Sequence, residues 1–370
     1  MLRDQEFQNS LTRTILLAAP IYLFWLFYLG NTMRYQQPFP YAEYYSQAQY
    51  LFDWRDWGFV KRGLIATLFP QTPETAGTFA AWFGLALGVI IVALSTALLW
   101  ISRMPVVLFL LMASPFFVYQ LGFMLGRLDA VGIIYFLGWL LSRELGWDRT
   151  SVVLYALSPL MLFVHEVFLL TILSAMFMVH NMEEFSIRKN LVFGVLSLAA
   201  VGLILVFGKI EQDHELLQAY FQHHYGEENL TQYVLTWSFA ENFSMNWERH
   251  MEPFGPHSAV TVGVALVFIP VFLVIFEIER IWVFLLATAG FFCVYVLGHD
   301  WARWTALYIS HFGIALCTVC NLRPVWGRLA ERFLVPLMIL SVIATPSNVT
   351  RIFTELLLFV RDREFYRLLS

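Results

Sequence analysis

Charged side chains gather in four short motifs of an otherwise apolar sequence. These are DWRDWGFVKRG (residues 53–63), GRLD (126–129), HE (165–166) and GHDWARW (298–304). Each motif places a carboxylate next to arginine, lysine or histidine. Arginine forks suit phosphate oxygens, and a partly desolvated carboxylate can take a proton from a hydroxyl nucleophile. Together the motifs could therefore support group transfer from a phosphate-bearing donor to a hydroxyl group.

Each motif taken alone also has a structural explanation. The first could be a solvated amphipathic helix, and Arg127 and Asp129 could pair to cap two helices. Asp300 suits a helix N-terminus, with Arg303 as its partner one turn later. The His165-Glu166 pair is harder to explain in this way, because apolar residues flank it on both sides. The four motifs together favour a function over four unrelated structural roles.

The composition indicates the elements that must position these motifs. Hydrophobic residues make up 59% of the chain, charged residues 14%, and the mean hydropathy is +0.64. An average soluble domain is about 45–50% apolar and about 25% charged. The net charge of −4 gives no reason to expect a nucleic-acid partner. The sequence therefore predicts an all-α polytopic membrane protein, with residues 1–370 forming a single integral membrane domain.

Apolar runs predict about eleven membrane spans, within a range of ten to twelve. They cover residues 14–30, 78–102, 104–124, 129–143, 151–163, 167–180, 191–208, 259–277, 281–297, 302–320 and 333–345. Short basic loops place the N-terminus in the cytosol. Two long segments, 31–77 and 209–258, then lie on the outer side, and residues 346–370 form an amphipathic C-terminal tail.

This topology places all four motifs on the outer side of the membrane. Ionisable groups near a membrane are costly and are retained where they serve a function. We therefore expect one site on the outer face, lined by aromatic side chains. Its predicted members are Asp53, Asp56, Lys61, Arg62, Arg127, Asp129, His165, Glu166, His299, Asp300 and Arg303.

The layout resembles the GT-C superfamily of membrane glycosyltransferases, which use polyprenyl-phosphate-linked sugars. The resemblance covers roughly residues 1–200: a cytosolic N-terminus, one span, and an outer segment that carries Asp53 and Asp56. It implies that Asp56 or Asp53 is the catalytic base. It also implies that Asp129 and the His165-Glu166 pair help to hold acceptor, phosphate or a divalent metal.

Two departures from the GT-C pattern leave alternatives open. Asp53 and Asp56 are three residues apart rather than an adjacent acidic pair, and no large soluble C-terminal domain follows. A requirement for Mg²⁺ or Mn²⁺ is therefore open, and no other cofactor is expected. The O-antigen polymerase and ligase group also remains an alternative, because residues 209–258 are similar in position to its large outer loop.

The resulting hypothesis is an inverting glycosyl transfer. Asp56 would accept the proton of the acceptor hydroxyl, and Lys61, Arg62, Arg127 and Arg303 would bind the donor and stabilise the departing lipid phosphate. The remaining members would position acceptor or metal: Asp129, Glu166 and Asp300, with His165 and His299 as hydrogen-bond partners.

The expected partners are a lipid-linked sugar donor, a glycan, glycolipid or protein acceptor, and membrane lipids. The expected location is a bacterial inner membrane, with the site facing the periplasm and serving polysaccharide or glycolipid assembly. A transporter is the rival from another class, since intramembrane charges also mark substrate pathways. A membrane-bound acyltransferase, with His165 or His299 as its base, is a second enzymatic alternative.

Overall fold

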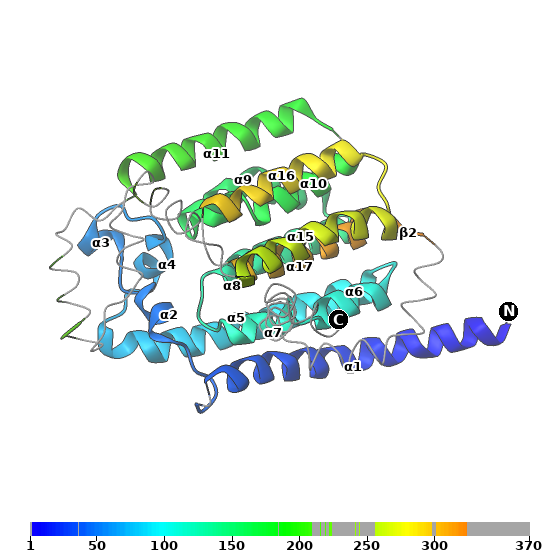
Figure 1. Cartoon of the computed structure of the whole chain (residues 1–370), viewed down its shortest axis with the longest axis horizontal. Helices are drawn as coiled ribbons and strands as arrows, with labels where there is room; N and C mark the ends of the chain where they lie inside the picture. Colours follow the sequence, from blue (N-terminus) through cyan, green and yellow to red (C-terminus); the bar gives the residue numbers. More distant parts are fainter. Residues whose placement is uncertain are drawn as a thin grey trace, which may run out of the picture.

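The computed structural model describes residues 2–35, 37–183, 185–208, 256–297 and 301–323, with isolated positions between 215 and 244. Within these residues the chain is all-α apart from one pair of two-residue strands, which confirms the all-α part of the predicted fold class. The long helices lie side by side with their axes roughly aligned (Figure 1).

The first half of the chain contains α1 (Leu2–Tyr35), α2 (Tyr44–Ala48), α3 (Trp54–Trp57), α4 (Gly63–Leu68), α5 (Pro73–Ile101), α6 (Pro105–Ala113), α7 (Val118–Phe123), α8 (Asp129–Glu144) and α9 (Asp148–Leu157). Two 3₁₀ turns follow, η1 (Ser158–Phe163) and η2 (Glu166–Leu169), and then α10 (Ile172–Glu183) and α11 (Ile187–Phe207). The second half contributes α15 (Pro256–Ile275), β1 (Phe276–Glu277), α16 (Ile281–Leu297), α17 (Trp301–Val319) and β2 (Asn321–Leu322).

Within the described residues, five segments are long and apolar enough to cross a membrane, which indicates an integral membrane protein. They are Thr12–Thr32, Pro73–Ile101, Pro105–Phe123, Glu166–Glu183 and Ile187–Phe207, and residues 262–275 and 281–295 form shorter apolar helices.

The predicted count of about eleven spans is not confirmed. The predicted spans at 129–143 and 151–163 correspond to short helices, since α8 has 16 residues and α9 has 10 before the chain tightens into η1. The predicted span at 333–345, the tail at 346–370 and most of the outer loop at 209–258 lie outside the described residues.

Small residues allow α1 and α7 to cross closely. A Cβ atom on Gly122 would lie 1.9 Å from the carbonyl oxygen of Phe27, so only glycine fits there. Glycine at such crossings lets helix backbones approach in membranes. One turn further along α1, the Nδ2 of Asn31 donates to the carbonyl oxygens of Gly122 (3.2 Å) and Tyr41 (2.8 Å). The amide N–H of Tyr41 donates back to Asn31 Oδ1 at 3.1 Å, which fixes the start of the segment that carries α2, α3 and α4.

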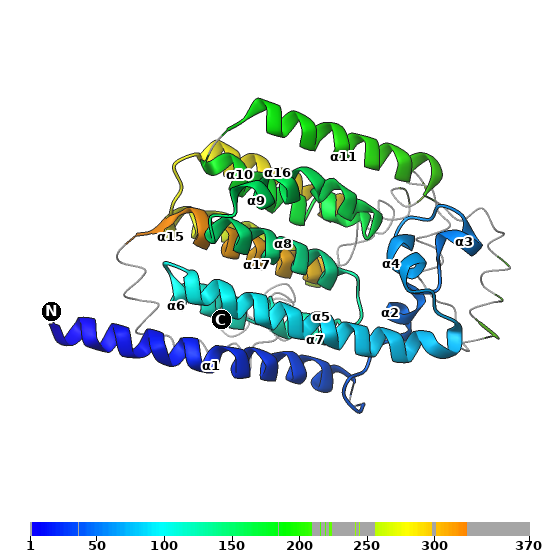
Figure 2. The same ribbon diagram turned by 180° about the vertical axis from the view of Figure 1, so that it is seen from behind.

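The short helices α2, α3 and α4 lie together at one end of the long helices (Figures 1 and 2). The antiparallel pair β1–β2, with Phe276 opposite Leu322, lies at the other end, where α15 and α17 finish. Since α8 and α17 run away from the α2–α4 end, their first residues lie there. Asp129 begins α8, and Arg303 lies in the first turn of α17. The fold therefore brings these two charges to the same end of the molecule as the 53–63 motif.

Candidate functional site

The first motif folds around a helix cap. Asp53 is buried, and its Oδ1 accepts hydrogen bonds from the backbone N–H groups of Arg55 (2.7 Å) and Asp56 (2.9 Å) at the start of α3. This is the usual stabilising role of aspartate at a helix N-terminus. The side chain of Asp56 is exposed and makes no hydrogen bond or ion pair with other described residues. Thus the structure gives Asp53 a structural role and leaves Asp56 apart from the other predicted site residues.

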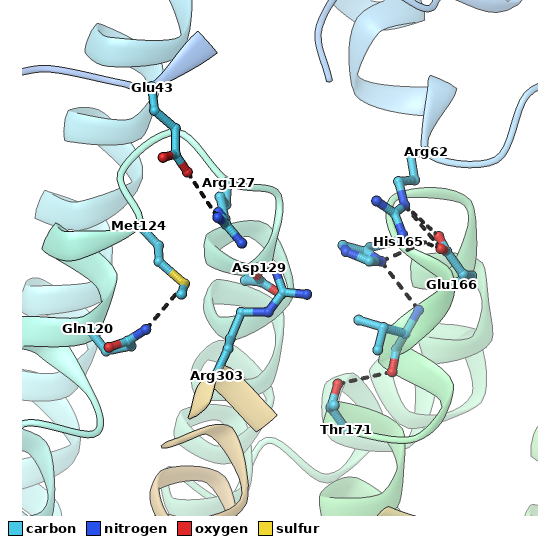
Figure 3. Close-up of polar contacts among 11 residues, drawn as sticks. Glu43, Arg62, Gln120, Met124, Arg127, Asp129, His165, Glu166, Thr171 and Arg303 are labelled. Atoms are coloured by element: carbon cyan, nitrogen blue, oxygen red, sulfur yellow. Dashed lines mark hydrogen bonds and ion pairs between the residues drawn. The ribbon is translucent and has the colours of Figure 1, made fainter. Parts of the chain in front are cut away.

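Arg62 reaches Glu166 across more than one hundred residues of sequence. Its Nε donates to both carboxylate oxygens, at 3.0 and 2.8 Å, and its Nη2 donates to Oε1 (Figure 3). Arg62 has a φ angle of 69°, and no other non-glycine residue in the described part of the chain has a positive φ. Such backbone strain persists only where surrounding contacts hold it. The bidentate ion pair and the turn into α4 supply those contacts.

Lys61 lies beside this pair and is buried, with 9% of its surface exposed. Its backbone N–H donates to the carbonyl oxygen of Gly208, 3.1 Å away at the end of α11. Burial lowers the pKa of Lys61 to about 8, although the Glu166 carboxylate opposes this shift. The ammonium group is therefore mostly charged at pH 7, at a desolvated position next to Arg62.

His165 lies at the break between η1 and η2 and is 3% exposed. Its Nδ1 accepts from the backbone N–H of Val167 at 3.3 Å and lies 3.4 Å from Glu166 Oε2. Burial lowers the pKa of His165, the charge of Arg62 lowers it further, and Glu166 opposes both effects. The imidazole is therefore neutral at pH 7. Its contact with Glu166 is a polar contact rather than an ion pair.

Arg127 forms the second ion pair of this region. Its Nη2 lies 2.9 Å from Glu43 Oε1, and both side chains are largely buried (Figure 3). Gly126 adopts a φ of +85°, which glycine tolerates, and its carbonyl oxygen accepts a 2.7 Å hydrogen bond from the Tyr50 hydroxyl. The turn between α7 and α8 is thus fixed on both sides of Arg127. Glu43 is a member of this region that the sequence analysis did not identify.

Asp129 and Arg303 form the third pair. The Arg303 Nη1 lies 3.4 Å from Asp129 Oδ2, and only about a tenth of each side chain is exposed. The guanidinium group also stacks on the indole ring of Trp304, 4.1 Å from the ring centroid. The other carboxylate oxygen, Asp129 Oδ1, is buried and has no hydrogen-bond partner among the described residues. That oxygen is available to a hydrogen-bond donor from a ligand.

These pairs belong to one electrostatic unit. Besides Arg303, the Asp129 carboxylate interacts with the charges of Arg127 and Arg62 and with His165. Figure 3 shows the Asp129–Arg303 and Arg62–Glu166 pairs facing a common region. We call this set the polar cluster: Glu43, Lys61, Arg62, Arg127, Asp129, His165, Glu166 and Arg303. These residues carry four cations and three carboxylates, and the Glu241 carboxylate also interacts with the charge of Lys61.

The structure thus brings together seven of the eleven predicted site residues. Asp53 and Asp56 have no contact with the polar cluster in the described part of the chain, and His299 and Asp300 lie outside that part. Among the described residues, no group of three or more His, Cys, Asp or Glu side chains is arranged to hold a metal ion. The question of an Mg²⁺ or Mn²⁺ requirement, which the sequence leaves open, is not tested by this arrangement.

Comparison with known proteins adds no further information about this site. No family model, no curated protein and no solved structure matches the chain. The resemblance to GT-C enzymes therefore rests on the layout of the sequence alone, and the function must be argued from the polar cluster.

Proposed function

We propose that this chain is a membrane glycosyltransferase that moves a sugar from a polyprenyl-phosphate-linked donor to a hydroxyl acceptor. The main support is the polar cluster itself, in which fixed cations surround a buried carboxylate at one end of apolar helices. In this proposal that end faces the periplasm from a bacterial inner membrane. The product belongs to a cell-surface polysaccharide or glycolipid.

The cations of the polar cluster would bind the phosphate of the donor. Arg62, Arg127 and Arg303 are each held by a carboxylate, so their guanidinium groups are ordered before a ligand arrives. Such preorganised charges stabilise a transition state without reorganising during the reaction. Negative charge grows on the phosphate oxygen as the glycosidic bond breaks. The ordered guanidinium groups and the low exposure of the cluster make the cluster suited to that change.

Asp129 is the carboxylate that we assign as proton acceptor. Arg303 holds its Oδ2, while Oδ1 is left to accept a hydrogen bond from the hydroxyl of the acceptor. The hydroxyl oxygen would attack the anomeric carbon, and the bond from that carbon to the phosphate oxygen would break. The electron pair leaves with the phosphate, and the proton passes to Asp129. The sequence favours Asp56 for this role, so Asp56 is the competing base.

Glu166 and His165 would position the reacting groups rather than exchange protons. Glu166 is held by Arg62 through both oxygens, so its charge is already compensated. His165 Nδ1 faces both the N–H of Val167 and Glu166 Oε2, so Nε2 is the ring nitrogen left for the substrate. It would form a hydrogen bond with a hydroxyl group of the substrate.

The test is a transfer assay with the full chain in lipid nanodiscs. The donors are undecaprenyl phosphates that carry radiolabelled hexoses or pentoses, and the acceptors are membrane glycolipids. Asp129→Asn should lower the rate by about 10²–10⁴-fold, the usual contribution of general base catalysis. Asp53→Asn, which keeps a capping oxygen, is the matched control and should retain the rate.

The other outcomes discriminate among the alternatives. Loss of activity in Asp56→Asn with full activity in Asp129→Asn would return the base assignment to Asp56. Transfer only from a diphosphate-linked oligosaccharide would favour a polymerase or ligase. Uptake of a solute into proteoliposomes without any bond formation would contradict the glycosyltransferase proposal and favour a transporter.

A further inference from the structure

Two buried polar atoms of helix α17, both on residues that follow Arg303, have no hydrogen-bond partner in the described part of the chain. Trp304 is 4% exposed and His311 is fully buried, yet the indole Nε1 and the imidazole Nε2 have no hydrogen-bond partner among the described residues. Buried polar groups in folded proteins are almost always satisfied by protein, water or ligand. The two residues are seven positions apart, so they lie on nearly the same face of α17.

The hydrogen bond at Nδ1 fixes the tautomer of His311. Nδ1 lies 2.7 Å from the carbonyl oxygen of Leu307, which can only accept a hydrogen bond. A neutral imidazole carries a single N–H, so the proton is on Nδ1. The Nε2 atom therefore presents a lone pair to its surroundings, and the missing partner of His311 is a donor such as a hydroxyl group.

The unpaired atoms continue the polar cluster along α8 and α17. The ring of His311 lies 5.3 Å from that of Phe136, which is seven residues after Asp129 and so on the same face of α8. His311 also interacts electrostatically with Asp129. Near the N-terminus of α17, Trp304 lies against the guanidinium group of Arg303, which pairs with Asp129. Trp304 Nε1, next to Arg303, thus supplies a donor, and His311 Nε2, two helical turns further along α17, supplies an acceptor.

We infer that Trp304 and His311 form a subsite for the hydroxyl groups of the donor sugar. This inference rests on the proposed function and adds where the sugar lies relative to the phosphate. A sugar offers several hydroxyl groups that both donate and accept, which matches the mixed set of unpaired atoms. With the phosphate among the arginines, the sugar would extend between α8 and α17 toward His311. Each hydrogen bond gives the subsite a preference for a hydroxyl over a hydrogen at that position.

The experiment compares two probe lipids on the full chain in nanodiscs: undecaprenyl phosphate, and undecaprenyl phosphate carrying a hexose. His311→Phe removes the acceptor and keeps a ring, whereas His311→Gln keeps an acceptor oxygen. We expect His311→Phe to weaken binding of the hexose lipid by about tenfold, as for one lost hydrogen bond, and to leave binding of undecaprenyl phosphate unchanged. His311→Gln should recover part of the loss, and Trp304→Phe should act in the same direction as His311→Phe.

Monodispersity and thermal unfolding of each variant confirm that it is folded. Equal binding of the hexose lipid by wild type, His311→Phe and Trp304→Phe would overturn the subsite and indicate that internal water satisfies these atoms. The proposed function would survive that result if Asp129→Asn still abolished transfer. If the wild type bound neither lipid, the proposed function itself would fail, and the subsite with it.

Discussion

The ion pair between Arg62 and Glu166 allows a quantitative prediction. Arg62 is 12% exposed at its side chain and Glu166 is 30% exposed, so the pair is partly buried. Breaking a buried pair typically costs about 3–5 kcal/mol, and exposed pairs couple by about 0.2–1 kcal/mol. The bidentate geometry and the intermediate burial place this pair between those limits. We expect a coupling energy of about 2 kcal/mol.

A double-mutant cycle measures that coupling. Arg62→Gln, Glu166→Gln and the double variant are unfolded in the same detergent as the wild type, with tryptophan fluorescence as the signal. The matched control is the pair between Arg143 and Glu183, whose acid is 55% exposed, with an expected coupling below about 1 kcal/mol. If the two cycles gave equal coupling energies, or if the Arg62–Glu166 value were near zero, the claim that this pair is preorganised would be refuted.

Three further predictions use the same unfolding assay. Gly122→Ala should lower the free energy of unfolding by about 3 kcal/mol, because the new Cβ meets the carbonyl oxygen of Phe27 at 1.9 Å. Gly138→Ala is the control: a Cβ there meets nothing within 4 Å among the described residues, so the variant should stabilise α8 by up to about 1 kcal/mol. Asp53→Ala should lower the free energy of unfolding by about 1 kcal/mol, because it removes the cap of α3. An unchanged free energy of unfolding would contradict the capping role. Burial lowers the pKa of Lys61 from 10.5 to about 8, so between these pH values the unfolded chain binds more protons than the folded chain. Stability should therefore rise by about 3 kcal/mol across that window, and Lys61→Met should remove the rise.

Much of the fold follows from the sequence, because apolar length and composition are local properties. The runs that predict spans at 78–102 and 191–208 form the long helices α5 and α11. The number of crossings does not follow so directly. The run at 129–143 begins with the charged Asp129, and α8 is only 16 residues long. Its place between other helices depends on packing that hydropathy does not describe.

The convergence of charged motifs was predictable from topology, whereas the pairing of individual charges was not. Alternation of helices predicts that Arg62 and Glu166 share one end, and the structure pairs them directly. Glu43 could not be predicted as a site residue, because no other charged residue lies near it in the sequence and only the turn at Gly126 brings Arg127 to it. His311 could not be predicted either, because a single histidine in an apolar helix resembles a core residue with satisfied hydrogen bonds. Only the three-dimensional structure shows that its Nε2 has no partner among the described residues.

The most direct test of the central claim is the position of a bound lipid phosphate. The measurement is an experimental density map of the full chain in nanodiscs with undecaprenyl phosphate. Our account predicts phosphate density within hydrogen-bond distance of Arg62, Arg127 or Arg303, with the polyprenyl tail leaving between the helices. A phosphate bound elsewhere, with the ion pairs of the polar cluster closed and undisturbed, would contradict the claim that this cluster is the substrate site.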